Sequence, residues 1–344
     1  MAFDVSAISG TGGSSLPDFG ARYRLDCDTG RSALRLALRQ SRRRSNSARI
    51  WLPDYICPSV PAACRAEDFA VMYFPDRPGQ VLLDQPPQVA SGDTVLYVHY
   101  FGRVNTAFSA WLQETNASRD WILIEDAVQA AYSQGIGLLG DYVITSLRKW
   151  WPAPDGAVLC STTVLDGTPP TAADEQFVGM RTVAKLLRGG NAPADEFLSI
   201  IESAEALLEQ APPRSISWMS RYLLNRCDPI PMTQARRSNW LSLQSAIGAP
   251  LLAHAGIFPL FSALEPGEVP LAFPIRVADG RDKLRGYLAE RRIYCPIHWA
   301  LLDTVTSSGN SRALSAELLS LPIDQRYDVN DMHRIVSALL EYCQ

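Results

Sequence analysis

Lysine is the scarcest reactive side chain in this 344-residue sequence, which contains 29 arginines but only Lys149, Lys185 and Lys283. Lys185 and Lys283 lie in stretches with the pattern of solvated helix faces. Lys149 instead follows a strand-like run and precedes two tryptophans, so we expect it in a rigid, partly desolvated loop. An amine in such a place can lose its proton and act as a nucleophile. Lys149 is therefore the leading candidate for covalent chemistry, with an ordinary surface lysine as the alternative.

Two carboxylates, Glu125 and Asp126, end an apolar run that begins at Trp121. Ligands of open α/β sheets bind beyond the carboxyl ends of the strands, and successive side chains of a strand point to opposite sides. We therefore expect one acid to face a ligand crevice and the other to have a structural role. A helix cap or a hydrogen-bonded structural acid is the alternative for either.

A possible anion site opens the first predicted helix, which covers residues 31–43. The segment Thr29-Gly30-Arg31-Ser32-Ala33 stands at its start. Free backbone N–H groups and the helix dipole favour an anion there, such as a phosphate. The alternative is an ordinary helix-starting turn.

The elements that must position these residues alternate along the first half of the chain. Short β-rich runs at 49–52, 70–74, 94–100, 121–125, 142–146 and 157–161 are separated by helical stretches, which favours a mostly parallel α/β sheet. Longer helices are predicted at 172–187, 194–210 and 232–246. The remainder predicts strands at 269–277 and 318–321 and helices at 281–291 and 329–342. We expect an arm at 1–22, a large domain at 23–240 and a small α+β domain at 241–344.

The order of these pieces resembles the DegT/DnrJ/EryC1/StrS family of fold type I pyridoxal-phosphate-dependent sugar aminotransferases. The resemblance implies a large domain, in which helices flank a mostly parallel sheet of the seven-stranded type, and a small C-terminal α+β domain. The matching segments are Gly30-Arg31-Ser32-Ala33-Leu34, Leu52-Pro53-Asp54-Tyr55-Ile56-Cys57-Pro58, His99-Tyr100-Phe101-Gly102, Ile124-Glu125-Asp126-Ala127-Val128-Gln129-Ala130, Ser146-Leu147-Arg148-Lys149, Arg236-Arg237-Ser238-Asn239-Trp240 and Leu319-Ser320-Leu321-Pro322-Ile323.

The resemblance also implies roles for single residues. Lys149 would hold pyridoxal 5'-phosphate as a Schiff base, and Asp126 would keep the pyridine nitrogen protonated. Gln129 would lie beside the ring, and Cys57 aligns with the position that often stacks on it. His298 is a tentative substrate contact, with structural hydrogen bonding as the equal alternative. The phosphate would be held by the backbone around Gly30, Arg31 and Ser32 and by the Ser146 hydroxyl.

The implied activity is transfer of an amino group from glutamate to a nucleotide-linked keto sugar, in polysaccharide or secondary-metabolite biosynthesis, by a homodimer. Other pyridoxal-phosphate chemistry on the same fold, such as a sugar dehydratase or amino-acid lyase, is the first alternative. A non-catalytic regulatory protein that binds the cofactor is the second. It stays open because the family's Asn-x-Arg-Met segment is not evident near Ser215 to Arg226.

Composition excludes several other classes. A net charge of −4 gives no basic surplus for nucleic acid. The seven cysteines are odd in number and scattered, and the four histidines lack a metal-binding spacing, so we predict no metal site. No apolar run approaches the ~20 residues of a membrane span, and the start lacks a signal-peptide pattern, so we expect no membrane partner and a cytoplasmic location.

Overall fold

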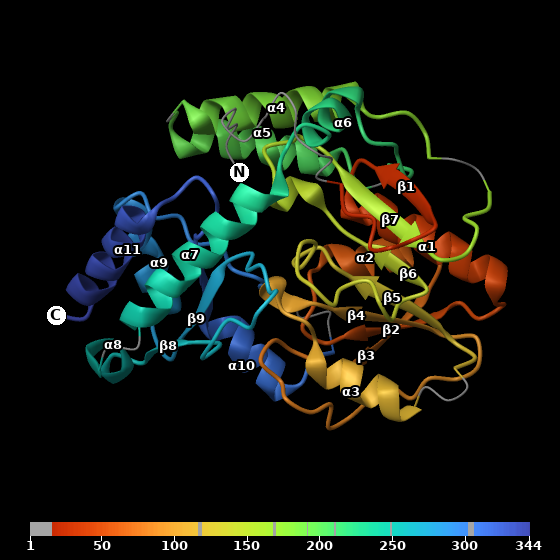
Figure 1. Cartoon of the computed structure of the whole chain (residues 1–344), viewed down its shortest axis with the longest axis horizontal. Helices are drawn as coiled ribbons and strands as arrows, with labels where there is room; N and C mark the ends of the chain where they lie inside the picture. Colours follow the sequence, from red (N-terminus) through yellow and green to blue (C-terminus); the bar gives the residue numbers. More distant parts are fainter. Residues whose placement is uncertain are drawn as a thin grey trace.

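The computed structural model describes residues 16–115, 119–167, 170–190, 192–209, 211–247, 250–301 and 306–344. It contains a large mixed sheet, a helical hairpin and a small three-stranded sheet, and Figure 1 shows the large sheet on the right, the small one on the left and the hairpin along the top. Most of the expected arm lies outside the described residues. Leu16, which belongs to that expected arm, is buried.

The large sheet has seven strands in the order β1-β7-β6-β5-β4-β2-β3. The neighbours from β6 to β3 pair in parallel, whereas β7 pairs antiparallel with both β6 and β1. The predicted α/β class and mostly parallel sheet are therefore confirmed. The strands are β1 (Tyr23–Cys27), β2 (Arg49–Pro53), β3 (Ala70–Phe74), β4 (Thr94–Val98), β5 (Ile122–Asp126), β6 (Tyr142–Ile144) and β7 (Ala157–Ser161).

Helices cover both faces of this sheet. On one face lie α1 (Gly30–Arg44) and α2 (Ser59–Arg65), and on the other lies α3 (Thr106–Thr115), whose Phe108 packs against Tyr97 of β4. Helix α1 starts where the Thr29 side chain accepts a hydrogen bond from the Ser32 N–H. Its buried leucines, such as Leu34 and Leu38, each contribute about 1.5–3 kcal/mol by leaving water. This packing holds the start of α1 at the edge where the parallel strands end.

The second half of the chain adds the hairpin and the small sheet. The hairpin is α4 (Glu175–Gly189) and α5 (Ala194–Ala206), followed by α6 (Trp218–Leu224). Helix α7 (Pro229–Ile247) joins two cores. Its Met232 belongs to a core that includes side chains of the large sheet, and its Trp240 belongs to the core of the small sheet. The remaining elements are α8 (Pro250–His254), β8 (Ile257–Pro259), β9 (Phe273–Val277), α9 (Arg281–Glu290), α10 (Gly309–Glu317), β10 (Leu318–Leu321) and α11 (Val329–Tyr342).

The predicted elements in this half are present with shifted ends. The strand expected at 269–277 starts only at Phe273, because Pro270 has no N–H and the Arg236 guanidinium donates to the carbonyls of Pro270 and Leu271. The boundary expected at 240/241 stays a prediction, and α7 crosses it without a break. Within the described ranges, no helix is long and apolar enough to cross a membrane.

Candidate active site

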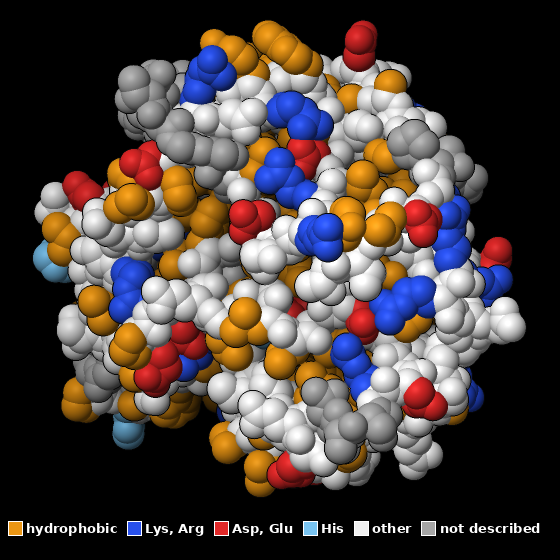
Figure 2. Space-filling view, turned by 45° about the vertical axis from the view of Figure 1, so that its right-hand side comes forward, with side chains coloured by type: hydrophobic (Ala, Val, Ile, Leu, Met, Phe, Trp, Pro, Cys, Tyr) orange, Lys and Arg blue, Asp and Glu red, His pale blue; other side chains and the backbone are white. Residues whose placement is uncertain are grey.

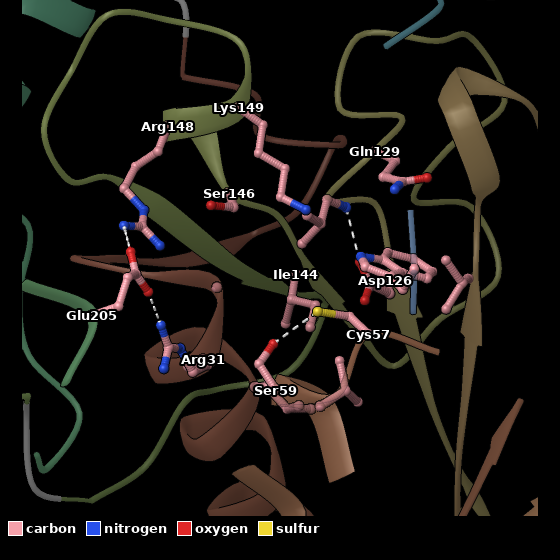
Figure 3. Close-up of a pocket in the computed structure, with 16 residues that line it drawn as sticks. Arg31, Cys57, Ser59, Asp126, Gln129, Ile144, Ser146, Arg148, Lys149 and Glu205 are labelled. Atoms are coloured by element: carbon pink, nitrogen blue, oxygen red, sulfur yellow. Dashed lines mark hydrogen bonds and ion pairs between the residues drawn. The ribbon is translucent and has the colours of Figure 1, made fainter. Parts of the chain in front are cut away.

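A cavity of about 290 Å³ opens where the parallel strands of the large sheet end. The strand register places Val98, Asp126 and Ile144 side by side at the carboxyl ends of β4, β5 and β6, and all three line the cavity. Figure 3 shows the cavity with its labelled side chains. Seven of the nine predicted site residues line it: Gly30, Arg31, Cys57, Asp126, Gln129, Ser146 and Lys149.

The two acids at the end of β5 point to opposite sides, as strand geometry predicts. Asp126 faces the cavity, and its Oδ1 accepts a hydrogen bond from the Val128 N–H at 2.9 Å. Burial raises the pKa of Asp126, against the Val128 N–H and the positive charge of Lys149, which lower it. A cation inside the cavity would therefore stabilise the ionised carboxylate.

Glu125 serves the structural role. It accepts a hydrogen bond from His99 Nε2 at 2.8 Å and others from the N–H groups of Gly137 and Gly140. The His99 Nδ1 accepts from the Asn105 N–H at 3.0 Å, so the ring proton is on Nε2. Burial raises the pKa of Glu125, but the His99 and backbone hydrogen bonds outweigh it and hold the pKa below its usual range.

The loop that carries Lys149 is anchored by the two tryptophans that follow it. Trp150 and Trp151 are fully buried. The Trp150 indole N–H donates to the Val128 carbonyl at 3.2 Å, and the Trp150 carbonyl accepts from Gln325 Nε2 at 2.8 Å. The Arg236 guanidinium lies 4.8 Å from the Trp150 ring centroid. These contacts hold the backbone of Lys149 while its side chain enters the cavity, as Figure 3 shows.

Gln129 presents an unused donor to the cavity. Its Oε1 accepts from the Phe101 N–H at 2.8 Å, whereas its Nε2 is buried and has no hydrogen-bond partner among the described residues. The turn that supplies this N–H requires glycine at position 102. Gly102 has a φ of 91°, and an added Cβ would lie 2.0 Å from the Val269 carbonyl oxygen. A buried donor with no partner is costly, and a ligand acceptor would satisfy it.

The first residues of α1 form the other end of the cavity. A Cβ built on Gly30 would lie 3.4 Å from Ser146 Cβ, so the helix start and the loop after β6 are in close approach. The N–H groups of Gly30 and Arg31 belong to the first turn and point out of the helix. Ser32 differs: its N–H donates to Thr29, its hydroxyl accepts from the Arg214 N–H, and it lines a neighbouring cavity instead.

His298 also lies outside the lining of this cavity. Its Nδ1 makes a hydrogen bond of 2.9 Å with the Ser320 hydroxyl. Burial, followed by the positive charge of Lys149, lowers the pKa of His298 to about 3. The ring is therefore neutral at physiological pH, and this hydrogen bond matches the structural alternative. Cys57, in contrast, lines the cavity, with its sulfur 3.1 Å from the Ser59 hydroxyl.

Several lining residues escaped the sequence prediction. Val128 adjoins Gln129 and Arg148 adjoins Lys149 in the sequence, so the motifs themselves could have indicated them. Glu205 comes from the end of α5 and Trp299 from the loop between α9 and α10. Neither has a local signal, because only the tertiary fold brings these segments to the cavity.

Comparisons with known proteins bear on the fold. No family model matches the sequence, and no curated protein matches it. Among solved structures, the aminotransferase TlmJ from Streptoalloteichus hindustanus is similar with a TM-score of 0.66 at 18% identity, over 92% of this chain and 85% of that chain.

Two further structures agree. A DegT DnrJ EryC1 StrS aminotransferase from Brucella abortus has a TM-score of 0.62 at 13% identity, over 94% of this chain and 87% of its own. Spr1654 of Streptococcus pneumoniae is assigned as a sugar aminotransferase and solved in its PLP form. It has a TM-score of 0.65 at 14% identity, over 98% of this chain and 93% of that chain. The chain therefore has the fold of the DegT/DnrJ/EryC1/StrS aminotransferases, as its sequence motifs predicted.

Proposed function

We propose that this protein is a pyridoxal-5'-phosphate-dependent aminotransferase. The observation that carries the proposal is that one cavity brings together Lys149, the carboxylate of Asp126, the unused donor of Gln129 and the start of α1. An amine, an acid, a ring-edge donor and a phosphate-binding helix start are the groups this cofactor requires. Spr1654 in its PLP form shares the fold and supports the choice of cofactor.

The residues of the chain divide the work by position. Lys149 would hold the cofactor through its Nζ, and the same Nζ would accept the proton from the substrate carbon that bears nitrogen. Asp126 would hold the pyridine N–H with its carboxylate, whose Oδ1 accepts from the Val128 N–H and whose Oδ2 stays available for the cofactor. When bound, the cofactor supplies an electron sink for the reacting carbon. Gly30, Arg31 and Ser146 lie at the end of the cavity where its phosphate would be held.

We further propose glutamate as the amino donor and a nucleotide-linked keto sugar as the acceptor. The assignment of Spr1654 as a sugar aminotransferase supports a sugar acceptor. The decisive measurement is the absorbance spectrum of the cofactor-loaded protein. Glutamate should remove the absorbance of the lysine-bound cofactor, and a nucleotide-linked keto sugar should restore it. A loaded protein whose spectrum is unchanged by glutamate and by glutamine would exclude transamination.

We also propose that the enzyme acts in the cytoplasm as a homodimer. Aromatic and aliphatic side chains are exposed together on α6 and the start of α7. Trp218 is 77% exposed and Ile230 is 62% exposed, and the Trp218 ring lies 5.3 Å from that of Tyr222. A second copy that covers these side chains would remove apolar surface from water. Sedimentation should give a dimer, and Trp218→Glu should shift it toward monomer, whereas a monomeric wild-type protein would refute this assembly.

A further inference from the structure

Three arginines from separate segments converge on one carboxylate at one end of the cavity. Glu205 of α5 accepts hydrogen bonds from Arg31 of α1 and from Arg148 at 2.9 Å, and its carboxylate lies 3.5 Å from Arg181 of α4. Figure 3 shows Arg31, Glu205 and Arg148 together on the left, Asp126 on the right and Lys149 between them. The group therefore lies at the end of the cavity opposite Asp126.

This group carries surplus positive charge. Three guanidinium groups contact a single carboxylate. Buried Lys185 adds a basic side chain near Arg181 and Arg148. Asp28 and Asp155 place acidic side chains near Arg148, so basic groups outnumber acidic ones here. The Nε atoms of Arg148 and Arg181 are buried and have no hydrogen-bond partner in the described parts of the chain. In Figure 2, Lys and Arg side chains are spread from the upper part of the face to its right-hand side, with acidic side chains among them.

The electrostatic environment agrees with this geometry. Burial raises the pKa of Glu205, but Arg148, Arg31 and Arg181 outweigh it and lower the pKa to about 2. Burial, followed by repulsion from Arg148, lowers the pKa of Arg181 to about 10. Glu205 and Arg181 are therefore both ionised at neutral pH. Gathering like charges in a half-buried place is costly unless an anion compensates them.

A phosphate suits the position of this basic group. The first-turn N–H groups of Gly30 and Arg31 and the Ser146 side chain line the same cavity as Glu205 and Arg148. A phosphate monoester carries a charge of about −2 at neutral pH, and arginine forks suit its oxygens. We propose that Arg31, Arg148 and Arg181, arranged by Glu205, bind the phosphate dianion of the cofactor, and that this binding fixes the α4–α5 hairpin against the large sheet.

Phosphate binding could fix the position of the hairpin because few other contacts tie it to the large sheet. Its own core is small and centres on Phe177, Ala204 and Leu208. The Arg148 guanidinium lies 5.6 Å from the Phe177 ring centroid, which adds a second contact between that arginine and the hairpin. Arg31 lies on α1 and Arg148 lies just after β6, so both are held by the large sheet and its helices. Arg181 lies on α4 of the hairpin. A phosphate that binds all three bridges the two parts.

The test uses the full-length protein after removal of cofactor. Hydrogen exchange of the hairpin amides is measured with inorganic phosphate and with chloride at equal ionic strength. At a phosphate concentration 100-fold above Kd, exchange that requires hairpin release should slow by up to about 100-fold. Arg181→Gln should abolish this slowing. Arg188→Gln is the matched control on α4, because Arg188 lines a different cavity, against α9, and should leave the slowing intact.

This inference rests on the proposed function, and the two can fail separately. If phosphate binds by calorimetry while the hairpin amides exchange unchanged or faster, the bridging role is wrong even if glutamate still converts the cofactor. If phosphate does not bind at all, the arginine site is wrong. Protein in which borohydride has fixed the cofactor should gain no further protection from added phosphate. A further gain would mean that the arginines bind another phosphate and would overturn their assignment to the cofactor.

Discussion

Asp126→Asn is the substitution that tests the proposed chemistry most directly. Asparagine has the shape of aspartate, so its Oδ1 can still accept the Val128 N–H that Asp126 accepts at 2.9 Å. The fold and the cavity should therefore persist. The substituted amide presents an NH₂ group to the cavity where the carboxylate presented an acceptor, so it cannot accept a proton from the pyridine nitrogen. The variant should bind cofactor yet react slowly.

The size of the effect follows from the lost hydrogen bond. A charge-assisted hydrogen bond in a buried site contributes about 2–3 kcal/mol, which corresponds to a rate loss of about 30- to 160-fold. The carboxylate of Asp126 is buried, so solvent does not replace the interaction. The assay is a single turnover with saturating glutamate, followed by the absorbance of the lysine-bound cofactor. The matched control is Glu125→Gln, the neighbouring acid that points away from the cavity and should keep a near-normal rate.

A rate for Asp126→Asn within about threefold of wild type, with cofactor bound, would refute the role of the carboxylate. Equal losses of the single-turnover rate in Asp126→Asn and Glu125→Gln would refute the assignment of a catalytic role to Asp126 and a structural role to Glu125. Loss of cofactor binding in Asp126→Asn would show that the carboxylate retains the cofactor rather than activates it.

Three further predictions follow from single residues. After borohydride reduction of the loaded protein, peptide mapping should find the cofactor on Lys149, and a label on Lys185 or Lys283 would overturn the assignment. Glu125→Gln should lower the free energy of unfolding by about 1–3 kcal/mol in denaturant titration. The carboxylate accepts hydrogen bonds from His99 and the Gly140 N–H, and an amide NH₂ group in its place would face one of these donors with a hydrogen of its own. An unchanged midpoint would contradict this. Burial raises the pKa of Asp76 to about 7, so over the range from about pH 4 to 7 the folded protein keeps a proton on Asp76 that the unfolded chain has lost. The free energy of unfolding that this proton contributes is therefore full below about pH 4 and is lost as pH rises to about 7. In Asp76→Asn, the free energy of unfolding should fall by up to about 4 kcal/mol less between pH 4 and 8 than in the wild type. An identical pH profile of the free energy of unfolding in wild type and variant would refute this.

The sequence predicted those parts of the site that one segment specifies. Lys149 was identifiable because lysine is rare and because a strand and two tryptophans flank it, and the tryptophans are the residues that anchor its loop. Because side chains alternate along a strand, the residues indicated that one of Glu125 and Asp126 faces the crevice, and only the resemblance to the family selected Asp126. The pairing with His99 decides it, and that pairing joins two different strand ends.

Other parts could not be predicted because distant segments determine them. Strand β1 was not predicted, and it forms by antiparallel pairing with β7, more than a hundred residues later in the chain. Ser32 belongs to the predicted helix start, but its hydroxyl is taken by Arg214, so it serves the connection to the segment before α6. Glu205 enters the cavity only because the tertiary fold brings the end of α5 to the start of α1, where Arg31 contacts it. Charge compensation among Arg31, Arg148 and Arg181 has no sequence signature at all.

The position of Lys149 depends on the C-terminal part of the chain as much as on the large sheet. Gln325 joins the Trp150 carbonyl to the Arg236 guanidinium, which in turn donates to the carbonyl of Leu271 next to β9. On the opposite wall, the Tyr55 hydroxyl donates to the His298 carbonyl and accepts from the Trp299 N–H.

Both walls of the cavity are therefore tied to the segments around the small sheet. A displacement of those segments would shift the lysine loop and Trp299 together. For this reason, we expect the segments around the small sheet to help set the distance between Lys149 and Asp126. Gln325 lies outside the cavity lining, and Gln325→Ala removes the hydrogen bond to the Trp150 carbonyl, so it should slow the single turnover of the loaded protein with glutamate. A wild-type rate would refute the link between these segments and Lys149.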